Sequence, residues 1–236
     1  MADRIPEVDI ARGCAIVLMI ISNFVTDLQY FFNYSGHETF WYWFARVTAF
    51  MFIFLAGISL VLSNKRSEYE KKDNFIKYLK RGLFIFSFGM LITIATFIFI
   101  PNDYVRFGVL HLIGLSVILS YFFLKLKNNH LNLVFGIIFV LFGFLFQKIT
   151  FNSDLFFIFG IISKTFSSVD YFPLFPWFGV VLLGIFAGRV LYKEHKPVFN
   201  FKENTPAKLF SFLGRNSLMI YLVHQPILLT LLFLLS

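Results

Sequence analysis

The sequence contains a single cysteine, Cys14, and few charged residues for its length. One cysteine excludes an intramolecular disulfide and leaves the redox compartment undetermined. Only 14% of the residues are charged, whereas about a quarter of a soluble domain is charged. Internal repeats, low-complexity linkers and soluble modules are also missing, so we expect one membrane domain covering residues 1–236.

Hydrophobic residues, by contrast, make up 58% of the chain, and 36 of its 236 residues are phenylalanine. So many large apolar side chains cannot all be buried in one soluble core of this size, and the lipid bilayer is the expected solvent. A membrane span takes about 20 apolar residues. Seven windows qualify: 10–31, 41–63, 82–100, 107–124, 131–147, 173–192 and 209–234. The sequence therefore predicts an all-α polytopic bundle of about seven transmembrane helices.

Lysine and arginine are distributed unevenly between the two sides of this predicted bundle. With the N-terminus placed in the cytoplasm, 17 of the 21 basic residues fall on the cytoplasmic side. The outer side receives Arg46, Arg106, Lys148 and Lys164. The positive-inside rule then predicts a multi-pass cell-membrane protein with a cytoplasmic N-terminus and an extracytoplasmic C-terminus. The net charge of +8 follows from these loops, so we expect no nucleic-acid partner.

Two remaining segments bear on this topology. The stretch 155–162 is apolar but too short to span, and we interpret it as interfacial or re-entrant. The N-terminal stretch is acidic and the first apolar run is too long for a signal core, so we expect no cleavable signal.

Polar residues gather near the predicted outer surface. Asn23 lies 13 residues after Ile10, about 20 Å from the inner face, and His224 lies 15 residues after Leu209, at about 22 Å. His111 lies about 6 Å below the outer face. The outer layer consists of Asn23, Asp27, His37, His111 and His224, and Arg46, Arg106 and Asp170 share this side. A lone histidine in a helix bundle often only makes an interhelical hydrogen bond, and this alternative stays open for His111 and His224.

A second polar set marks the predicted inner face. It consists of Asp9, Arg12, Arg81, Arg215 and Asn216. Guanidinium groups at this level suit bidentate binding of phosphate. Each arginine could equally be a snorkelling cation of the positive-inside rule, so both interpretations stay open.

Several motifs, taken in order, resemble a known family. The first segment reads Glu7-x-Asp9-x-x-Arg12-Gly13-x-Ala15-Ile16 and leads to Met19 and Asn23. Phe54-Leu55-Ala56-Gly57-Ile58-Ser59 and Phe107-Gly108-Val109-Leu110-His111-Leu112-Ile113-Gly114 follow. The C-terminal motif is Gly214-Arg215-Asn216-Ser217-Leu218-x-Ile220-Tyr221-Leu222-Val223-His224-Gln225-Pro226. This order resembles the catalytic membrane domain of the heparan-α-glucosaminide N-acetyltransferase family and its small prokaryotic relatives.

The resemblance implies an enzyme that moves an acetyl group from cytoplasmic acetyl-CoA to an amine or hydroxyl of an extracytoplasmic sugar or glycan. Acetyl-CoA is then a co-substrate, and no metal is expected. By position, the catalytic histidine of the family corresponds to His37 and its assisting asparagine to Asn23, although the gap between them is somewhat longer here. Asp27 belongs with them as a catalytic candidate. His111, His224, Gln225 and Arg46 are candidates for substrate binding, and the inner set for binding CoA.

The residue types suit this chemistry without the resemblance. Acyl transfer from a thioester needs a base for the nucleophile's proton, and histidine serves near neutral pH. An asparagine side chain can donate to the developing oxyanion. Two other functions remain open: a small-molecule transporter that uses the same polar cavity, and a haem- or quinone-binding protein in which His111 and His224 face each other. A homodimer is among the assemblies that the sequence allows.

Overall fold

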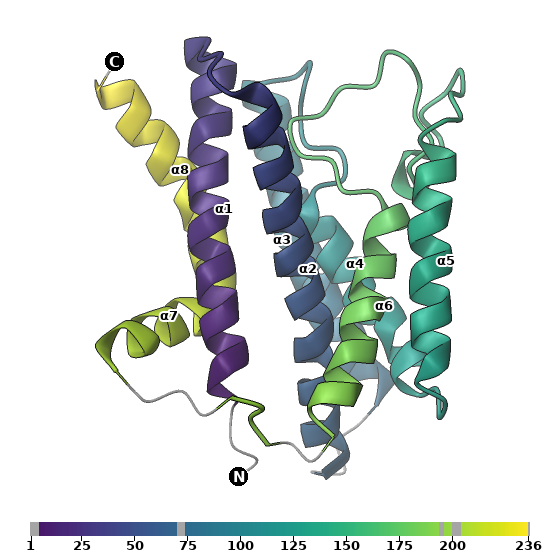
Figure 1. Ribbon diagram of the computed structural model, residues 1–236. Coiled ribbons are helices and arrows are strands. Elements are labelled where there is room, and N and C mark those ends of the chain that lie inside the picture. Colours follow the sequence, from purple (N-terminus) through teal and green to yellow (C-terminus); the bar gives the residue numbers. More distant parts are fainter. Residues whose placement is uncertain (1–4, 70–73, 194–195, 200–203, 236) are drawn as a thin grey trace. The chain divides into compact units, whose positions relative to one another are not determined.

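The computed structural model describes residues 5–69, 74–193, 196–199 and 204–235, and these residues form helices without a β-strand. Figure 1 shows the helices in chain order. They are α1 (Pro6–Phe32), α2 (Glu38–Tyr69), α3 (Phe75–Phe99), α4 (Val109–Leu124), α5 (His130–Phe146), the short 3-10 turn η1 (Phe157–Phe159), α6 (Leu174–Leu191), α7 (Thr205–Arg215) and α8 (Ser217–Leu235).

The helices confirm the prediction of an all-α membrane bundle. Five of them, α1, α2, α3, α6 and α8, are long and apolar enough to cross a bilayer. The helices α4 and α5 are apolar but shorter, with 16 and 17 residues. Of the basic residues assigned to the cytoplasmic side, Arg4, Lys71, Lys72 and Lys202 lie outside the described residues.

The seventh window, 209–234, was predicted too long at its beginning. The structure ends α7 at Arg215 and starts α8 at Ser217, with Asn216 outside helical geometry at φ −100° and ψ 14°. His224 therefore lies only seven residues into its helix, about 10 Å, instead of the predicted 22 Å. Hydropathy alone missed the break because the polar stretch Arg215-Asn216-Ser217 is short and apolar runs flank it on both sides.

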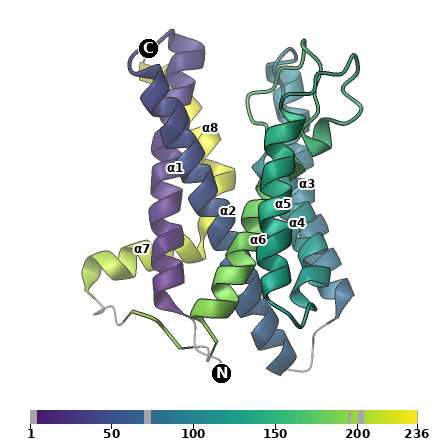
Figure 2. The same cartoon turned by 45° about the vertical axis from the view of Figure 1, so that its right-hand side comes forward.

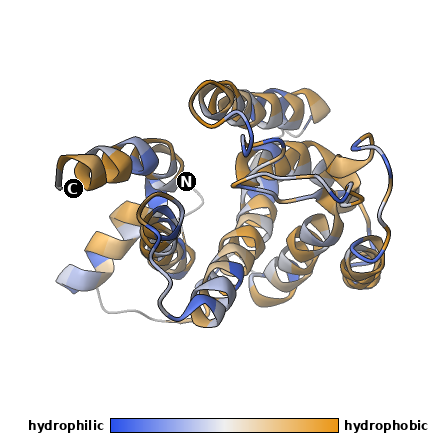
Figure 3. Cartoon of the chain, turned by 90° about the horizontal axis from the view of Figure 1, so that it is seen from above, coloured by the Kyte–Doolittle hydropathy of each residue, from blue (hydrophilic) through white to orange (hydrophobic). Residues whose placement is uncertain are grey.

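Large apolar side chains are exposed along whole helices. On α3, for example, Leu83, Leu91, Ile98 and Phe99 are each more than half exposed. Figure 3 shows hydrophobic residues, in orange, along much of the length of the helices. A contiguous exposed apolar surface of this extent marks contact with a membrane, and it explains how the chain accommodates its phenylalanines.

The described chain divides into two compact units. One comprises Met1–Leu55 and Glu194–Ser236, and the other comprises Ala56–Lys193. Helix α2 begins in the first unit and ends in the second. Each unit is described by itself below, and the single domain expected from the sequence stays a prediction.

In the first unit, α1 packs against both α7 and α8, and α7 lies across the beginning of α1 (Figures 1 and 2). The crossing of α1 and α7 is built on two glycines. A Cβ at Gly13 would overlap the carbonyl of Phe210, and a Cβ at Gly214 would overlap the carbonyl of Asp9. Glycine at both positions therefore lets the two backbones touch.

Glu7 fastens the start of α1 to the connection that precedes α7. Its side chain is buried, and its two carboxylate oxygens accept hydrogen bonds from the backbone N–H groups of Val198 and Phe199, at 2.8 and 2.7 Å. Charge-assisted bonds of this kind are stronger than bonds between neutral groups. This clamp holds two segments that lie about 190 residues apart in the sequence.

In the second unit, α6 packs against α4 and α5, and α3 packs against α4. Cations cap the helix ends on the predicted cytoplasmic side. Arg189 donates to the carbonyls of Leu124 and Leu126 at the end of α4, and Lys65 donates to those of Tyr192 and Lys193 after α6. Positive charge at a helix C-terminus complements the helix dipole, so these residues have structural roles.

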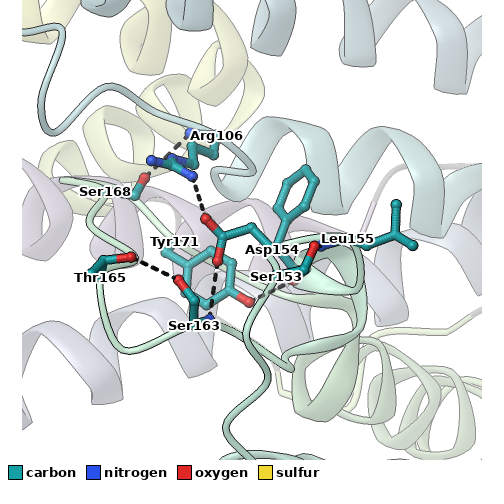
Figure 4. Close-up of polar contacts among 9 residues, drawn as sticks. Arg106, Ser153, Asp154, Leu155, Ser163, Thr165, Ser168 and Tyr171 are labelled. Carbon is teal, nitrogen blue, oxygen red and sulfur yellow. Dashed lines mark hydrogen bonds and ion pairs between the residues drawn. The ribbon is translucent and has the colours of Figure 1, made fainter.

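The connection between α5 and α6 folds back over the loop before α4. Figure 4 shows Arg106 donating to Asp154 at 2.9 Å, while the Ser163 N–H donates to the other carboxylate oxygen at 3.0 Å. The Tyr171 hydroxyl donates to the Phe157 carbonyl at 2.5 Å. The segment 155–162 thus contains the turn η1 and no spanning helix, so it adds no eighth crossing.

Two acidic residues in this connection have opposite electrostatic environments. Bonds from Ser163, followed by the charge of Arg106, lower the pKa of Asp154. Burial raises the pKa of Asp170 to about 6, although the Val109 N–H at the start of α4 donates to its carboxylate at 3.2 Å. Ionisation of Asp170 therefore lowers the stability of the fold, whereas ionisation of Asp154 raises it.

We expect the stability of this loop to fall as the pH rises from about 4 to about 6. In that range the folded chain keeps a proton on Asp170 that the unfolded chain releases, so the free energy of unfolding falls as the pH rises. Asp170→Asn keeps an acceptor for Val109 and removes the charge. It should raise stability at pH 7 by at most about 3 kcal/mol and leave it unchanged at pH 4. Thermal unfolding in detergent between pH 4 and 7 measures this, and Asp154→Asn, which should lower stability at pH 7, is the control.

Glu7→Gln should destabilise the first unit. The amide retains one acceptor oxygen but places an NH2 group against a backbone N–H, which costs about 1–3 kcal/mol. The midpoint of thermal unfolding should drop by several degrees, whereas Glu38→Gln, at an exposed position on α2, should leave it unchanged. Equal midpoints for the two variants would contradict the clamp.

Candidate functional site

A hydrogen-bonded asparagine–histidine pair joins α1 to α8. The Asn23 Nδ2 atom lies 2.7 Å from His224 Nε2. His224 Nδ1 lies 2.6 Å from the carbonyl oxygen of Tyr221, which can only accept a hydrogen bond. Nδ1 therefore carries the proton, and Nε2 of the neutral ring accepts from the Asn23 amide. The side chain of His224 is 7% exposed, so the pair lies within the packed helices.

The second N–H of the Asn23 amide faces a weak acceptor. It points to Met19 Sδ at 3.2 Å, and a thioether sulfur accepts hydrogen bonds poorly. One N–H is thus held by His224, while the other can exchange its partner for a carbonyl oxygen at little cost. An amide oriented in this way resembles the donors that stabilise oxyanions in acyl transfer.

One turn further along α1, a second polar pair follows the first. The Gln225 amide donates to Asp27 Oδ1 at 2.7 Å. Asp27 is only 5% exposed, and its Oδ2 atom has no hydrogen-bond partner among the described residues. Sequence reasoning placed Asn23, Asp27 and His224 in one layer and named Gln225 as a candidate for substrate binding. The structure brings the four residues together as two adjacent pairs.

The opposite end of α1 carries a cluster of charges. Asp9 lies 3.9 Å from Arg12 and 3.3 Å from Arg215, and Arg12 donates to the Ser217 hydroxyl at 2.7 Å. One carboxylate thus contacts two guanidinium groups. Arg215 is the more accessible cation, with a side chain 47% exposed. Asn216 is also exposed, and its amide donates to the Phe212 carbonyl.

Two of the predicted site residues belong to the second unit. Arg81 lies on α3 and donates to the Ser63 hydroxyl at 3.3 Å. His111 is 2% exposed and caps the start of α4, where its Nδ1 accepts from the Gly108 N–H at 3.2 Å. Its Nε2 lies 3.4 Å from the Thr93 hydroxyl. His111 and His224 thus both have their ring nitrogens in hydrogen bonds, and neither presents a free nitrogen to a haem iron.

His37 is exposed in the connection between α1 and α2. It has a φ of 52°, a left-handed conformation that residues other than glycine adopt infrequently. Its imidazole makes no hydrogen bond within the described part of the chain. Asn23 lies nine residues before the end of α1, so about 13 Å of helix separates it from the start of the connection that holds His37. The structure therefore pairs Asn23 with His224 and leaves His37 in the exposed connection that follows α1.

A pocket of about 570 Å³ opens beside this connection. Its lining residues are Thr26, Gln29, Asn33, Tyr34, Ser35, Glu38, Trp41, Tyr42, Ala45 and Arg46. Arg46 lies 5.2 Å from the centre of the Tyr42 ring, in cation–π geometry. Amide, carboxylate, guanidinium and aromatic groups thus line one cavity of a size usual for small-molecule sites.

Sequence reasoning missed Glu7, Met19 and Ser217 as parts of this unit. All three stand in the motifs quoted above. The roles of Glu7 and Ser217 depend on contacts across 191 and 205 residues, whereas Met19 contacts Asn23 one turn away on α1. Among the described residues, no group of three His, Cys, Asp or Glu side chains lies close enough to hold a metal ion.

Comparison with known proteins agrees with the motifs. No curated protein and no solved structure matches the chain. Residues 4–226 match the family described as heparan-alpha-glucosaminide N-acetyltransferase, catalytic. This match covers nearly the whole sequence, including most of the helices that carry the two polar clusters. The chain therefore belongs to the catalytic-domain family of the heparan-α-glucosaminide N-acetyltransferases, a family of membrane acetyltransferases.

Proposed function

We propose that the chain transfers an acetyl group from cytoplasmic acetyl-CoA to an amine or hydroxyl of an extracytoplasmic sugar or glycan. One observation carries this proposal: α1 and α8 bear both polar clusters of the first unit, cations at one end and the Asn23–His224 pair further along. From Arg12 to Asn23 the distance along α1 is about 16 Å. The elongated pantetheine arm of CoA is suited to bridge two clusters separated in this way.

Arg12 and Arg215 are the proposed binding groups for the phosphates of CoA, with Asp9 and Asn216 beside them. Guanidinium groups bind phosphate oxygens in a bidentate manner. Asp9 contacts both arginines and holds them near each other, and Arg215 is the more accessible of the two. The role of Arg81 in binding CoA, expected from the sequence, stays a prediction.

Asn23 is the proposed donor to the thioester oxygen, and His224 is its positioning residue. A single side-chain donor to an oxyanion can contribute about 3 kcal/mol to the barrier. His37 is the proposed general base, because its exposed imidazole makes no hydrogen bond within the described chain. Its infrequent backbone conformation fits a functional rather than a packing role.

The pocket at the end of α1 is the proposed place for the sugar ring. Aromatic faces and planar polar side chains such as Gln29, Asn33 and Glu38 suit the apolar and hydroxyl faces of a sugar. Arg46 is the proposed contact to an acidic group on the glycan. His111 holds the start of α4 within the second unit, and its role in binding substrate stays a prediction.

Arg215→Ala should weaken the binding of CoA about tenfold, or about 1.4 kcal/mol. CoA loses one phosphate contact in this variant, and its remaining affinity should depend less on salt concentration. Equilibrium binding of CoA to the purified protein at two salt concentrations measures both effects. Lys148→Ala removes an exposed cation from the predicted outer side and should change nothing. Equal losses in the two variants would indicate a general charge effect and contradict the assigned site.

Transfer should depend on the polar residues beyond the CoA site. Asn23→Ala and His37→Ala should each lower transfer from acetyl-CoA by about 100-fold or more, because a donor and a base each contribute on this scale. CoA binding should stay within about twofold of the wild type. His224→Gln, which keeps a polar side chain, should lower transfer less than Asn23→Ala.

Alanine variants of the two histidines also separate the role of general base from that of positioning Asn23. Full transfer by His37→Ala, with transfer lost in His224→Ala, would assign the base to His224 instead. A protein that neither binds CoA nor shifts its melting temperature with CoA would rule out the acetyltransferase proposal as a whole.

A further inference from the structure

The first turns of α2 carry two different surfaces next to each other. One is the α2 side of the pocket at the end of α1, formed by Glu38, Trp41, Tyr42, Ala45 and Arg46. The other, called the apolar groove below, is a hollow of about 560 Å³ lined by Thr39, Phe40, Trp43, Phe44 and Val47. The two sets alternate along the same stretch of helix, so a polar pocket and an apolar groove run side by side on α2.

The ring of Trp41 forms a wall between these two surfaces. It lies edge-on to the rings of Phe40 and Phe44, with ring centres 5.0 and 5.4 Å apart, and both of these residues line the groove. The Nε1 atom of Trp41 is buried and has no hydrogen-bond partner among the described residues. An indole N–H can only donate, and a buried donor without a partner is unfavourable. A ligand that brings an oxygen atom to this wall would satisfy the donor.

Arg46 supplies a cation at the level of lipid phosphates. It lies five residues after Trp41, where the predicted apolar run 41–63 begins, so its backbone is about 8 Å inside that run. Its guanidinium lies 5.2 Å from the centre of the Tyr42 ring, one turn nearer the start of the helix. The long side chain thus extends toward the membrane surface, as the side chains of arginines near helix ends do. Basic groups in this position bind lipid head groups.

The charges of the pocket have an order along α2. Glu38 lies at the start of the helix, and Arg46 follows eight residues later, about 12 Å along the axis. Neither of them forms an ion pair within the described part of the chain. A ligand with hydroxyl groups at the Glu38 end and an anion at the Arg46 end matches this order. A sugar whose phosphate points toward the membrane is such a ligand.

The apolar groove continues into the hydrophobic part of α2. Trp43 and Val47 are 62% and 55% exposed within it. Phe50 and Phe54 follow Val47 at helical spacing, and their rings stack with centres 5.7 Å apart. A groove along one helix offers a place for one hydrocarbon chain. An isoprenoid phosphate has a single chain, whereas a common phospholipid has two.

We propose that the acceptor is a lipid-linked sugar, in which the sugar is joined through phosphate to one isoprenoid chain. The sugar lies in the pocket, the phosphate binds Arg46, and the chain lies in the apolar groove. This inference rests on the proposed function and specifies how its acceptor is carried. The pocket then receives the acceptor by diffusion within the membrane instead of from solution.

The test compares four probes for binding to the purified full chain by native mass spectrometry, without acetyl-CoA. Farnesyl phosphate has the chain and the phosphate, farnesol has only the chain, and glucose 1-phosphate has only the polar part. The wild type should bind farnesyl phosphate about tenfold or more tightly than either of these, because apolar burial and a charge-assisted contact both contribute. Dioleoyl phosphatidic acid, which has two chains, should bind less tightly than farnesyl phosphate.

Two variants address the two contacts separately. Arg46→Gln should weaken the binding of farnesyl phosphate about tenfold and leave that of farnesol within about twofold of the wild type. Trp43→Gln should weaken the binding of both probes about threefold or more and leave glucose 1-phosphate unchanged. The controls are Arg215→Ala, which removes an exposed cation beside Asp9, and Phe84→Gln, which removes a ring on α3 that is 59% exposed. Neither control should change the binding of farnesyl phosphate.

The inference is overturned if the wild type binds farnesyl phosphate no more tightly than farnesol or phosphatidic acid. Equal losses in Arg46→Gln and Arg215→Ala, or in Trp43→Gln and Phe84→Gln, also overturn it, because they indicate general attraction of lipid. If acetyl transfer from acetyl-CoA to a soluble sugar is nonetheless measured, the proposed function stands alone. Binding of farnesyl phosphate that depends on Arg46 and Trp43, in a protein without any transfer, supports the lipid site and refutes the proposed function.

Discussion

Lipid offers no hydrogen bonds, and this constraint organises the first unit. A polar side chain on a spanning helix must find its partner on a neighbouring helix or on a ligand. Asn23 finds His224, and Asp27 finds Gln225, so two rungs of polar contact hold α1 against α8. The same pairs are the chemical groups of the candidate site. Packing and function therefore depend on the same contacts.

The motifs at the two ends of the chain serve this arrangement jointly. Arg12-Gly13 and Gly214-Arg215 meet where α7 crosses α1, with glycines at the point of contact and arginines around Asp9. The break at Asn216 then lets α8 start beside Arg12, through the bond to Ser217. Without that break, α7 and α8 would continue as one helix from Thr205, and His224 would lie 19 residues from its start instead of seven. The crossing thus sets the level at which His224 meets Asn23.

Much of the fold could be predicted from hydrophobic length, because each spanning helix needs a run of apolar residues and few other sequences satisfy that need. The division of 209–234 into α7 and α8 could not, because it depends on the contact between Gly13 and Gly214. The depth of Asn23 and His224 was predictable to within a few turns, but not that their side chains face each other. The exposed position of His37 between α1 and α2, with a φ of 52°, likewise could not be predicted. It depends on the conformation of a short connection that hydrophobic periodicity does not encode.

The two polar pairs differ in a way that bears on catalysis. In the Asn23–His224 pair both groups are neutral, and both ring nitrogens of His224 have a hydrogen-bond partner. The pair is therefore complete within the fold and can hold the Asn23 amide in place for a developing oxyanion. In the Asp27–Gln225 pair one carboxyl oxygen has no hydrogen-bond partner within the described residues. The two pairs therefore differ in that only the first is complete within the fold, although they lie one turn apart on α1 and α8. A donor that is held completely keeps its direction, and that direction is what stabilisation of an oxyanion requires.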